Sequence, residues 1–221
     1  MSTFSHDSAS SRFFSRKIIR RLLGAAFALT IFFATIWLER TTLLREAANL
    51  WIISDPVENS DVVAILGGGL EVRPFVAADL YKKGLVKRIL VSHVAEARTV
   101  EMGAAPGHSE LNRRLLLKLG VPDTDIDMFG SGNRSTRDEA AALRDWAGQH
   151  HISRIIIPTE IFSARRVQWI FDHEFAGSAV DIRVPSFDGP GYTRTEWWRT
   201  EAGMIAFQNE IMKYLYYRLK F

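Results

Sequence analysis

Apolar residues first gather in one long segment near the amino terminus, which carries no charge from Leu22 to Leu38. With Ile18 and Ile19 ahead of it, the segment is long enough to span a bilayer core of about 30 Å. A buried helix of a globular domain fits poorly, because such a helix keeps a polar face. A cleavable signal peptide is the other alternative, but no A-x-A cleavage site follows this segment. We therefore expect a retained transmembrane anchor over residues 18–38.

Basic residues precede this segment, and they account for the net positive charge of the chain. Residues 1–38 hold five of the 28 basic residues and one of the 25 acidic residues, so residues 39–221 are close to neutral. By the positive-inside rule the amino terminus lies in the cytoplasm. The remainder is then expected outside the cytoplasmic (inner) membrane of a bacterium, on its periplasmic or extracytoplasmic side. Because the basic charge belongs to the flank, and no nucleic-acid-binding motif is present, we expect no nucleic-acid partner.

Apolar residues recur at helical spacing between Thr41 and Ser54, which predicts a short amphipathic helix along the membrane or at the edge of a domain. Asp55-Pro56 would end this helix. Four regions are therefore expected, and they are a cytoplasmic basic flank over 1–17, the anchor over 18–38, a juxtamembrane helix and linker over 39–59, and an α/β domain over 60–221.

Beyond residue 60, short β-branched runs alternate with helical patterns. Asp61–Leu66 is nearly all apolar, as parallel strands buried on both faces are. This alternation predicts a Rossmann-like α/β fold with a doubly wound, mostly parallel sheet of about five strands. Further strands are expected at 87–92, 125–129, 154–158 and 180–184, and helices at 73–83, 109–119, 135–150, 161–175 and 194–219.

Three glycines, Gly67 to Gly69, follow the first strand, and a helical pattern begins at Arg73. Glycine lets a ligand approach the backbone closely, and N–H groups at a helix start favour an anion. In an open α/β sheet, ligands bind at the carboxyl ends of the strands. The segment matches neither G-x-G-x-x-G nor the P-loop pattern, so a plain tight turn is the alternative. A nicotinamide-dependent dehydrogenase fits poorly, because Ser92 stands where an acidic residue would end the second strand.

Other polar residues also follow strands, and each has a structural alternative. Arg134 is placed to clamp a phosphate or carboxylate, whereas Thr136-x-x-Glu139 also matches a capping box. Thr159 is a natural N-cap, and Ser163 and Arg166 face either the cleft or the solvent. The predicted ligand-binding residues are Gly67, Gly68, Gly69, Arg73, Ser92, Arg134, Thr136, Thr159, Ser163 and Arg166.

Glu110 and Glu139 are the candidate acid–base residues, with His93 as a further candidate. Ser109 as an N-cap with Glu110 in the first helical turn is the structural alternative. The sequence has no cysteine, and its six histidines show no metal-binding spacing, so no metal is expected. The aromatic residues near the carboxyl terminus are expected in the core or over the edge of the sheet, with lipid head groups as an alternative contact; they are Trp197, Trp198, Tyr214, Tyr216 and Tyr217.

A series of short motifs follows in a characteristic order. They are Gly67-Gly68-Gly69 with Arg73 and Gly84, Ile89-Leu90-Val91-Ser92, Ser109-Glu110, Gly120-Val121-Pro122, Ser135-Thr136-x-x-Glu139, Thr159-x-x-Phe162-x-x-x-Arg166, Trp198, and Asn209-Glu210-x-x-Lys213-Tyr214. This order resembles the SanA/YdcF/ElyC-like (YdcF-like) domain of bacterial envelope proteins over roughly residues 55–220.

The resemblance implies a Rossmann-like domain with a role in envelope integrity, peptidoglycan or polysaccharide metabolism, or undecaprenyl-phosphate handling. It also implies a phosphorylated or nucleotide-like ligand, such as S-adenosylmethionine in one branch, although no cofactor is identified for this chain. Two segments depart from the family pattern. Ser163 stands where the family has a histidine and Glu160 where it has a serine, and His93-Val94 replaces a glycine pair. Catalysis is therefore left open, and the alternative function is a non-catalytic docking factor for envelope-synthesis proteins.

Overall fold

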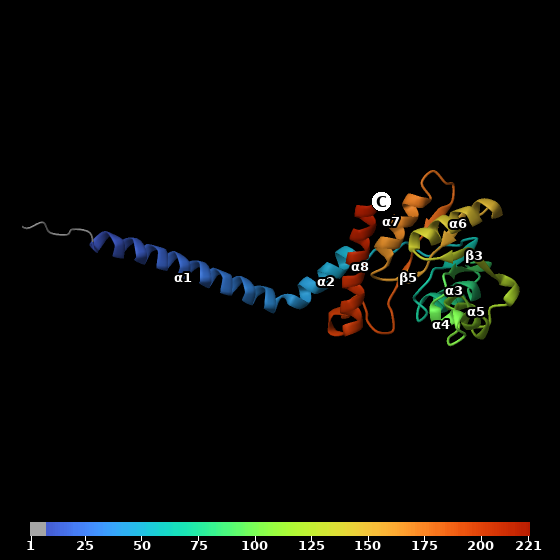
Figure 1. Ribbon diagram of the computed structural model, residues 1–221, viewed down its shortest axis with the longest axis horizontal. Helices are drawn as coiled ribbons and strands as arrows, with labels where there is room; N and C mark the ends of the chain where they lie inside the picture. The colour runs from blue at the N-terminus through green and yellow to red at the C-terminus, as the bar shows by residue number, and fades with distance from the viewer. Residues whose placement is uncertain (1–7) are drawn as a thin grey trace, which may run out of the picture. The chain divides into compact units, whose positions relative to one another are not determined.

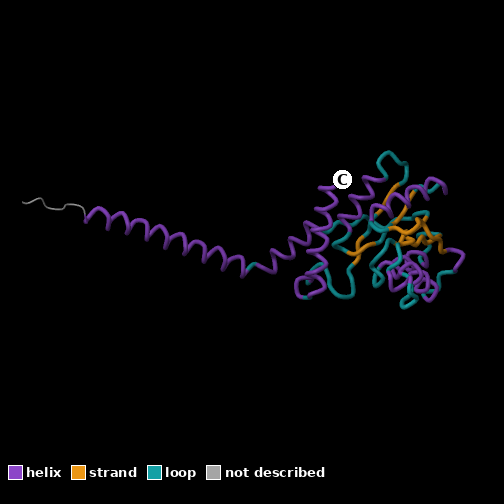
Figure 2. Tube along the Cα trace, in the orientation of Figure 1, coloured by secondary structure: helices purple, strands orange, loops and turns teal. Residues whose placement is uncertain are grey.

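A computed structural model describes residues 8–221, with side chains from residue 16 on. The chain divides into two compact units, of which the second is Ala48–Phe221. Figure 1 follows the chain through its elements, and Figure 2 shows that the strands all belong to the second unit.

The first unit contains helix α1, Ser8–Leu38. Within it, Arg16–Leu38 is a 23-residue stretch that reaches a mean hydropathy of 1.8 over 18 residues, and its large apolar side chains are exposed. It is the one helix among residues 8–221 that is long and apolar enough to cross a membrane. The structure thus contains an N-terminal apolar helix suited to a membrane anchor or a signal sequence. Helix α2, Arg40–Trp51, follows and confirms the expected short helix.

The second unit is built on a five-stranded sheet in which every pair of neighbours is parallel. The order is β3-β2-β1-β4-β6, which confirms the predicted Rossmann-like α/β fold. The strands are β1 (Val62–Ile65), β2 (Arg88–Val94), β3 (Ile126–Asn133), β4 (Arg154–Ile156) and β6 (Asp181–Arg183). The helices between them are α3 (Arg73–Lys82), α5 (His108–Lys118), α6 (Thr136–His150) and α7 (Ala164–Glu174).

Side chains of β1 alternate between two hydrophobic cores, because successive residues of a strand point to opposite faces of the sheet. Val62 and Ala64 pack with residues of α6 and α7, whereas Val63 and Ile65 pack with residues of α3 and α5. All four β1 residues are buried. A strand covered on both faces needs an unbroken apolar sequence, which explains why the pattern after residue 60 predicted it correctly.

Several connections differ from the expected elements. Helix α4, Arg98–Glu101, lies in the stretch expected to be irregular. Thr159 does not cap a helix but lies in β5, Thr159–Glu160, which pairs with β7, Ser186–Phe187. The N-cap of α7 is Ser163 instead. The chain after β4 therefore continues as a strand beside residues 185–187 before it turns into α7.

The last helix, α8, spans Glu201–Lys220 and begins later than the expected residue 194. Thr200 caps it by accepting a hydrogen bond from the Gly203 amide at 3.1 Å. A short 3₁₀ helix, Trp197–Arg199, precedes it. The end of α2 is tied to the same region, since the Trp51 ring packs edge-on against the ring of Tyr214. Helix α8 thus lies beside the rim formed by the strand ends.

Candidate functional site

A cavity of about 980 Å³ lies at the carboxyl ends of the central strands. Its lining comes from the segments that follow β1, β2, β3 and β4, together with α8. The strand order reverses between β1 and β4, and in open α/β sheets ligands bind at this switch point. The predicted residues that line the cavity are Gly67, Gly68, Gly69, Arg73, Arg134, Thr136, Glu139, Ser163 and Arg166.

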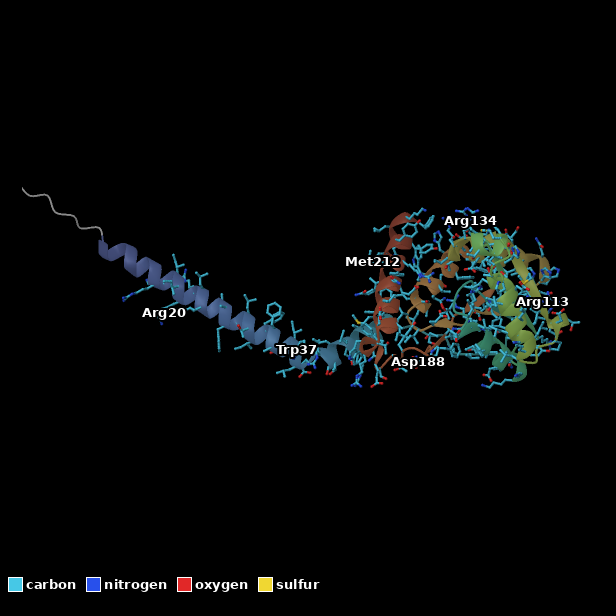
Figure 3. The ribbon with its side chains drawn as sticks, turned by 60° about the horizontal axis from the view of Figure 1, so that its bottom comes forward. Arg20, Trp37, Arg113, Arg134, Asp188 and Met212 are labelled. Atoms are coloured by element: carbon cyan, nitrogen blue, oxygen red, sulfur yellow. The ribbon has the colours of Figure 1, made fainter. Side chains whose placement is uncertain are left out.

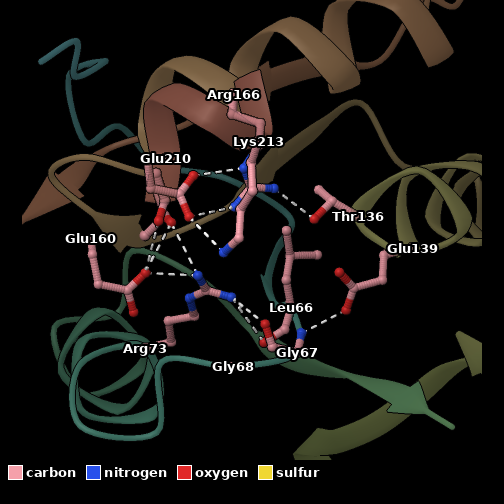
Figure 4. Close-up of polar contacts among 12 residues, drawn as sticks. Leu66, Gly67, Gly68, Arg73, Thr136, Glu139, Glu160, Arg166, Glu210 and Lys213 are labelled. Carbon is pink, nitrogen blue, oxygen red and sulfur yellow. Dashed lines mark hydrogen bonds and ion pairs between the residues drawn. The ribbon is translucent and has the colours of Figure 1, made fainter. Parts of the chain in front are cut away.

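Arg73 lies in the wall of this cavity and is held by the protein itself. Its guanidinium donates to the Gly67 carbonyl at 2.7 Å and to Glu160 Oε2 at 2.7 Å, and Figure 4 shows both contacts. Thr159 Oγ1 accepts a further bond from Arg73 at 3.3 Å. The Arg73–Glu160 ion pair is almost fully buried. It joins the start of α3 to the segment after β4.

Arg166 forms the second buried ion pair of the wall. Its guanidinium donates to both carboxylate oxygens of Glu210, at 2.6 and 3.2 Å, and each side chain is 7% exposed. A third bond goes to Thr136 Oγ1 at 2.8 Å. Lys213 Nζ lies 2.9 Å from Glu210 on the exposed side. This bidentate geometry connects α7, α8 and the start of α6 (Figure 4). The pairs Arg73–Glu160 and Arg166–Glu210 are called the cavity wall below.

Glu139 is buried and points to the turn of Gly67, Gly68 and Gly69, called the glycine turn below. Its Oε1 accepts the Gly67 amide at 2.5 Å. Burial raises the pKa of Glu139 above its ordinary value, although the Gly67 amide, Ser92 and the nearby arginines act in the opposite direction. A carboxyl group with a raised pKa in a cavity is suited to proton transfer.

The position of the helix cap leaves the side chain of Glu139 out of the capping interactions, so that it can face the cavity. The capping-box alternative for Thr136 and Glu139 is wrong, because the N-cap is Ser135, whose Oγ accepts the Asp138 amide at 3.2 Å. Asp138 in turn accepts the Arg134 amide at 3.0 Å. The cap lies one residue earlier than expected, and Thr136 and Glu139 both face the cavity.

His108 occupies the second amide of the glycine turn. Its Nε2 accepts the Gly68 amide at 3.1 Å. Burial, and secondarily the charge of Arg73, lower the pKa of His108. Glu139 thus accepts the Gly67 amide and His108 accepts the Gly68 amide. These are two of the backbone N–H groups that were predicted to bind an anion.

Glu160 and Tyr192 are two partly buried residues of the lining. Burial acts to raise the pKa of Glu160, but Arg73 outweighs it and leaves that pKa below its ordinary value. Burial, with nearby Glu160, raises the pKa of Tyr192 to about 12. Glu160 Oε1 is buried and makes no hydrogen bond among the described residues. This oxygen is thus enclosed by the protein, next to the backbone of Gly69.

Gly69 explains how the turn approaches this pair. It has a φ of +62°, and a Cβ there would lie 2.0 Å from Glu160 Oε1 and 2.6 Å from Arg73 Nε. Only glycine fits, both for its conformation and for the space. Gly69 therefore allows the backbone to lie close to the Arg73–Glu160 ion pair of the protein, and not to a ligand.

The exposed edge of the cavity, called the mouth below, carries Arg134 and Lys213. Lys213 has a side chain that is 56% exposed. The guanidinium of Arg134 makes no hydrogen bond or ion pair within the part of the chain that the structure describes, and Figure 3 shows it at the surface of the domain. Arg134 therefore differs from Arg73 and Arg166 in being free to bind a ligand.

Three predicted residues do not line the cavity. Ser92 is buried behind it and accepts a bond from Asn133 Nδ2 at 3.0 Å, and Thr159 is fully buried beneath it. Glu110 is exposed, forms an ion pair with Arg114, and lies with His93 at a second cavity of about 520 Å³.

Ser109 does not cap α5, whose N-cap is Gly107. Its Oγ donates to the Ser92 carbonyl at 2.9 Å and accepts the Val94 amide at 3.2 Å. The hydroxyl thus joins the start of α5 to the end of β2.

Other cavity residues were not among the predicted site residues. Their positions depend on segments that come back to the rim from elsewhere in the chain, and α8 contributes several of them. The motif of Asn209, Glu210 and Lys213 was visible in the sequence, but no local pattern connected it to a cavity. The additional residues include Glu96, His108, Asn133, Glu160, Tyr192, Asn209, Glu210, Lys213 and Tyr216.

Among the described residues, no cluster of three or more histidine or carboxylate side chains is arranged to hold a metal ion. The cavity lining combines four cationic side chains with four carboxylates, so their formal charges cancel. Which ligand groups the cavity can bind therefore depends on where each charge lies. No protein-family model and no curated protein matches this chain.

Proposed function

We propose that the α/β domain binds a phosphorylated or nucleotide-like small molecule in the cavity at the carboxyl ends of its strands. The observation that carries the proposal is the unengaged guanidinium of Arg134 at the mouth of a 980 Å³ cavity, located at the switch point of the sheet. An arginine there can bind a phosphate or carboxylate in a bidentate manner. Lys213 adds a second cation at the same edge.

The interior of the cavity supports a ligand with hydroxyl groups next to its anionic group. Glu139 and Glu160 both contribute carboxylates to the lining, and a carboxylate accepts hydrogen bonds from hydroxyl groups. Tyr192 and Tyr216 offer ring surfaces in the same cavity. This combination suits a nucleotide or a phosphorylated sugar, and a lipid-linked phosphorylated carrier is a ligand of the same class.

For a catalytic function, Glu139 is the better of the two acid–base candidates. It is buried in the cavity with a raised pKa, whereas Glu110 is exposed and paired with Arg114. A proton-transfer group works best with a pKa near the operating pH. Phosphoester or glycosyl chemistry inside the cavity is the reaction class that this arrangement supports.

We further propose that α1 is a retained anchor in the inner membrane of a bacterium, with the amino terminus cytoplasmic and the α/β domain periplasmic. The support is the basic flank ahead of an uncharged segment. Through its resemblance to the SanA/YdcF/ElyC-like family, the protein would act in cell-envelope biogenesis, of peptidoglycan or polysaccharide.

One observation favours a second candidate, a non-catalytic docking factor. Both wall arginines are already neutralised by carboxylates of the protein, and the amides of Gly67 and Gly68 are occupied by Glu139 and His108. A rim that satisfies its own polar groups can serve as a rigid docking surface. The two candidates differ in whether a small molecule binds at Arg134.

Thermal unfolding of the full chain in detergent distinguishes them. The panel contains inorganic phosphate, nucleotides, S-adenosylmethionine, nucleotide sugars and a short polyprenyl phosphate. A ligand at 100 times its Kd raises the melting temperature by roughly 5–10 °C, because it binds the native state alone. We expect such a shift for at least one panel member, and its loss in Arg134→Ala.

Arg98→Ala is the matched control, because Arg98 is also exposed and lies outside the residues that line either cavity. It is expected to keep the ligand response in full. A shift that survives in Arg134→Ala would place the ligand elsewhere. No shift with any panel member would contradict the anion-binding proposal and favour the docking factor.

A further inference from the structure

Helix α8 has an apolar face that is exposed to solvent in the described structure. Its inward positions, Gly203, Glu210 and Tyr217, are buried against the domain. On the opposite side, Met212 is 66% exposed and Leu219 is 87% exposed. Figure 3 shows Met212 on the side of α8 that faces away from the sheet. The exposed apolar residues outside the cavity lining, called the α8 outer face below, are Met204, Ile205, Met212, Leu215 and Leu219.

The spacing of these residues places them on one side of the helix. Ile205, Met212 and Leu219 recur every seven residues, and the other members fall beside them on an arc of about 100° at 100° per residue, interrupted by the exposed Gln208. Monomeric soluble proteins rarely expose so many large apolar residues on one side of a helix without using them. This face is therefore a candidate contact surface.

Basic residues border this face on both sides. Lys220 lies along one edge and Arg218 along the other, by their positions on the helix. Their long apolar stems can lie beside a hydrophobic surface while their charges reach anionic groups. An apolar stripe bordered by basic residues is typical of helices that lie in the interface of a bilayer.

We propose that the α8 outer face lies on the surface of an anionic lipid bilayer. The proposal rests on the anchor part of the proposed function. Residues 39–51 are all that separates the apolar helix from Trp51, whose ring packs on Tyr214 of α8. Thirteen residues span only about 20 Å as a helix. An anchored chain thus keeps α8 within reach of the bilayer.

A second copy of the chain is a poorer occupant of this face. Two α8 outer faces packed together would bring Arg218 and Lys220 of each copy close to those of the other. Acidic residues to neutralise them are scarce, since Glu201 is the one exposed acidic residue of α8. Anionic lipid head groups would neutralise both cations.

The absence of native cysteine allows a direct test in the full chain, reconstituted in vesicles of phosphatidylcholine with phosphatidylglycerol. A fluorophore is attached at Met212→Cys or, as the control, at Met102→Cys, a methionine 79% exposed beside α4. Quenching by lipid that carries a nitroxide near the head group is then measured. We expect at least about threefold stronger quenching at position 212, because an interfacial helix buries its apolar face about 5–10 Å deep.

Lipid charge and a second variant sharpen the outcome. Quenching at position 212 should fall when phosphatidylglycerol is omitted, and also in Arg218→Glu with Lys220→Glu. Equal quenching at positions 212 and 102 would overturn the proposal, as would self-quenching between labelled copies at position 212. Release of the protein by a carbonate wash would contradict the anchor instead, so the two failures are distinguishable.

Discussion

The cavity wall and the cavity mouth use the same residue types in opposite ways. In the wall, Arg166 and Glu210 are each 7% exposed and hold one another in bidentate contact. At the mouth, Arg134 is exposed and its guanidinium is unengaged within the described part of the chain. An arginine after a strand is therefore not by itself a ligand-binding residue. What decides its role is whether a carboxylate from another segment reaches it first.

This difference is electrostatic in origin. A buried charge is costly to keep unless it is paired and hydrogen-bonded, so the wall arginines require their carboxylates for the fold. An exposed charge is solvated by water and needs no partner. The wall is accordingly expected to respond to substitution with loss of stability, and the mouth with loss of ligand binding.

The largest expected effect comes from breaking the pair between Arg166 and Glu210. Glu210→Ala leaves the buried guanidinium without its carboxylate, which costs about 3–5 kcal/mol in the free energy of unfolding. Urea denaturation measures this cost. The double variant Arg166→Met with Glu210→Leu is expected to recover most of it, because apolar side chains of similar volume need no partner.

An exposed ion pair just before α8 is the control for this prediction. Arg199 and Glu196 lie 2.9 Å apart with both side chains largely exposed. Glu196→Ala is expected to change stability by less than about 1 kcal/mol. Equal costs for Glu210→Ala and Glu196→Ala would show that the wall pair does not hold the fold together.

An intermediate effect is expected at the glycine turn. Gly69 and Gly84 both have positive φ, +62° and +71°, so alanine costs roughly 1–2 kcal/mol at each for its backbone alone. At Gly69 the new Cβ would also displace the Arg73–Glu160 pair, whereas nothing lies within 4 Å at Gly84. Gly69→Ala should therefore destabilise by about 2 kcal/mol more than Gly84→Ala. Similar midpoints in urea would contradict this close packing.

The smallest effect, and the most specific, concerns the pH dependence of stability through Glu139. Its pKa is raised above the ordinary value of 4.5 by burial. The folded state thus holds the proton more tightly than the unfolded chain does. The stability that this proton contributes is present in full below pH 4.5 and is lost as the pH rises through the folded-state pKa.

Glu139→Gln keeps an acceptor for the Gly67 amide but cannot titrate. The difference in unfolding free energy between wild type and Glu139→Gln should change by up to about 1.4 kcal/mol per pH unit in that window. Unfolding curves at a series of pH values from 4 upward measure it, and subtraction cancels the other carboxylates. A difference that is independent of pH would show that the pKa of Glu139 is not raised.

The sheet was predictable from local patterns, because strands covered on both faces need continuous apolar runs such as Val62–Ile65. Placement of the polar residues after the strands also followed, since parallel strands end at one edge. Thr159 was misplaced because its pairing partner, β7, lies 27 residues further along the chain. Local propensity favoured a cap, and tertiary strand pairing overrode it.

The candidate site was predictable only as a location. Glu139 was selected for two incompatible roles, and a shift of one residue in the helix cap decided between them. A capping signal with Ser135 and Thr136 in succession has no unique register, because either hydroxyl can accept an amide at the helix start. The tertiary contact between Thr136 and Arg166 selects Ser135 as the cap.

By itself, the sequence determined the apolar N-terminal helix, the α/β alternation and the meeting of polar residues at one edge of the sheet. These follow from periodicity and composition, which act over a few residues. The tertiary structure alone decided which charges are free. Arg73 meets a carboxylate 87 residues away and Arg166 one 44 residues away. No local pattern encodes such pairs, because the free energy that selects them exists only once folding has removed both partners from water.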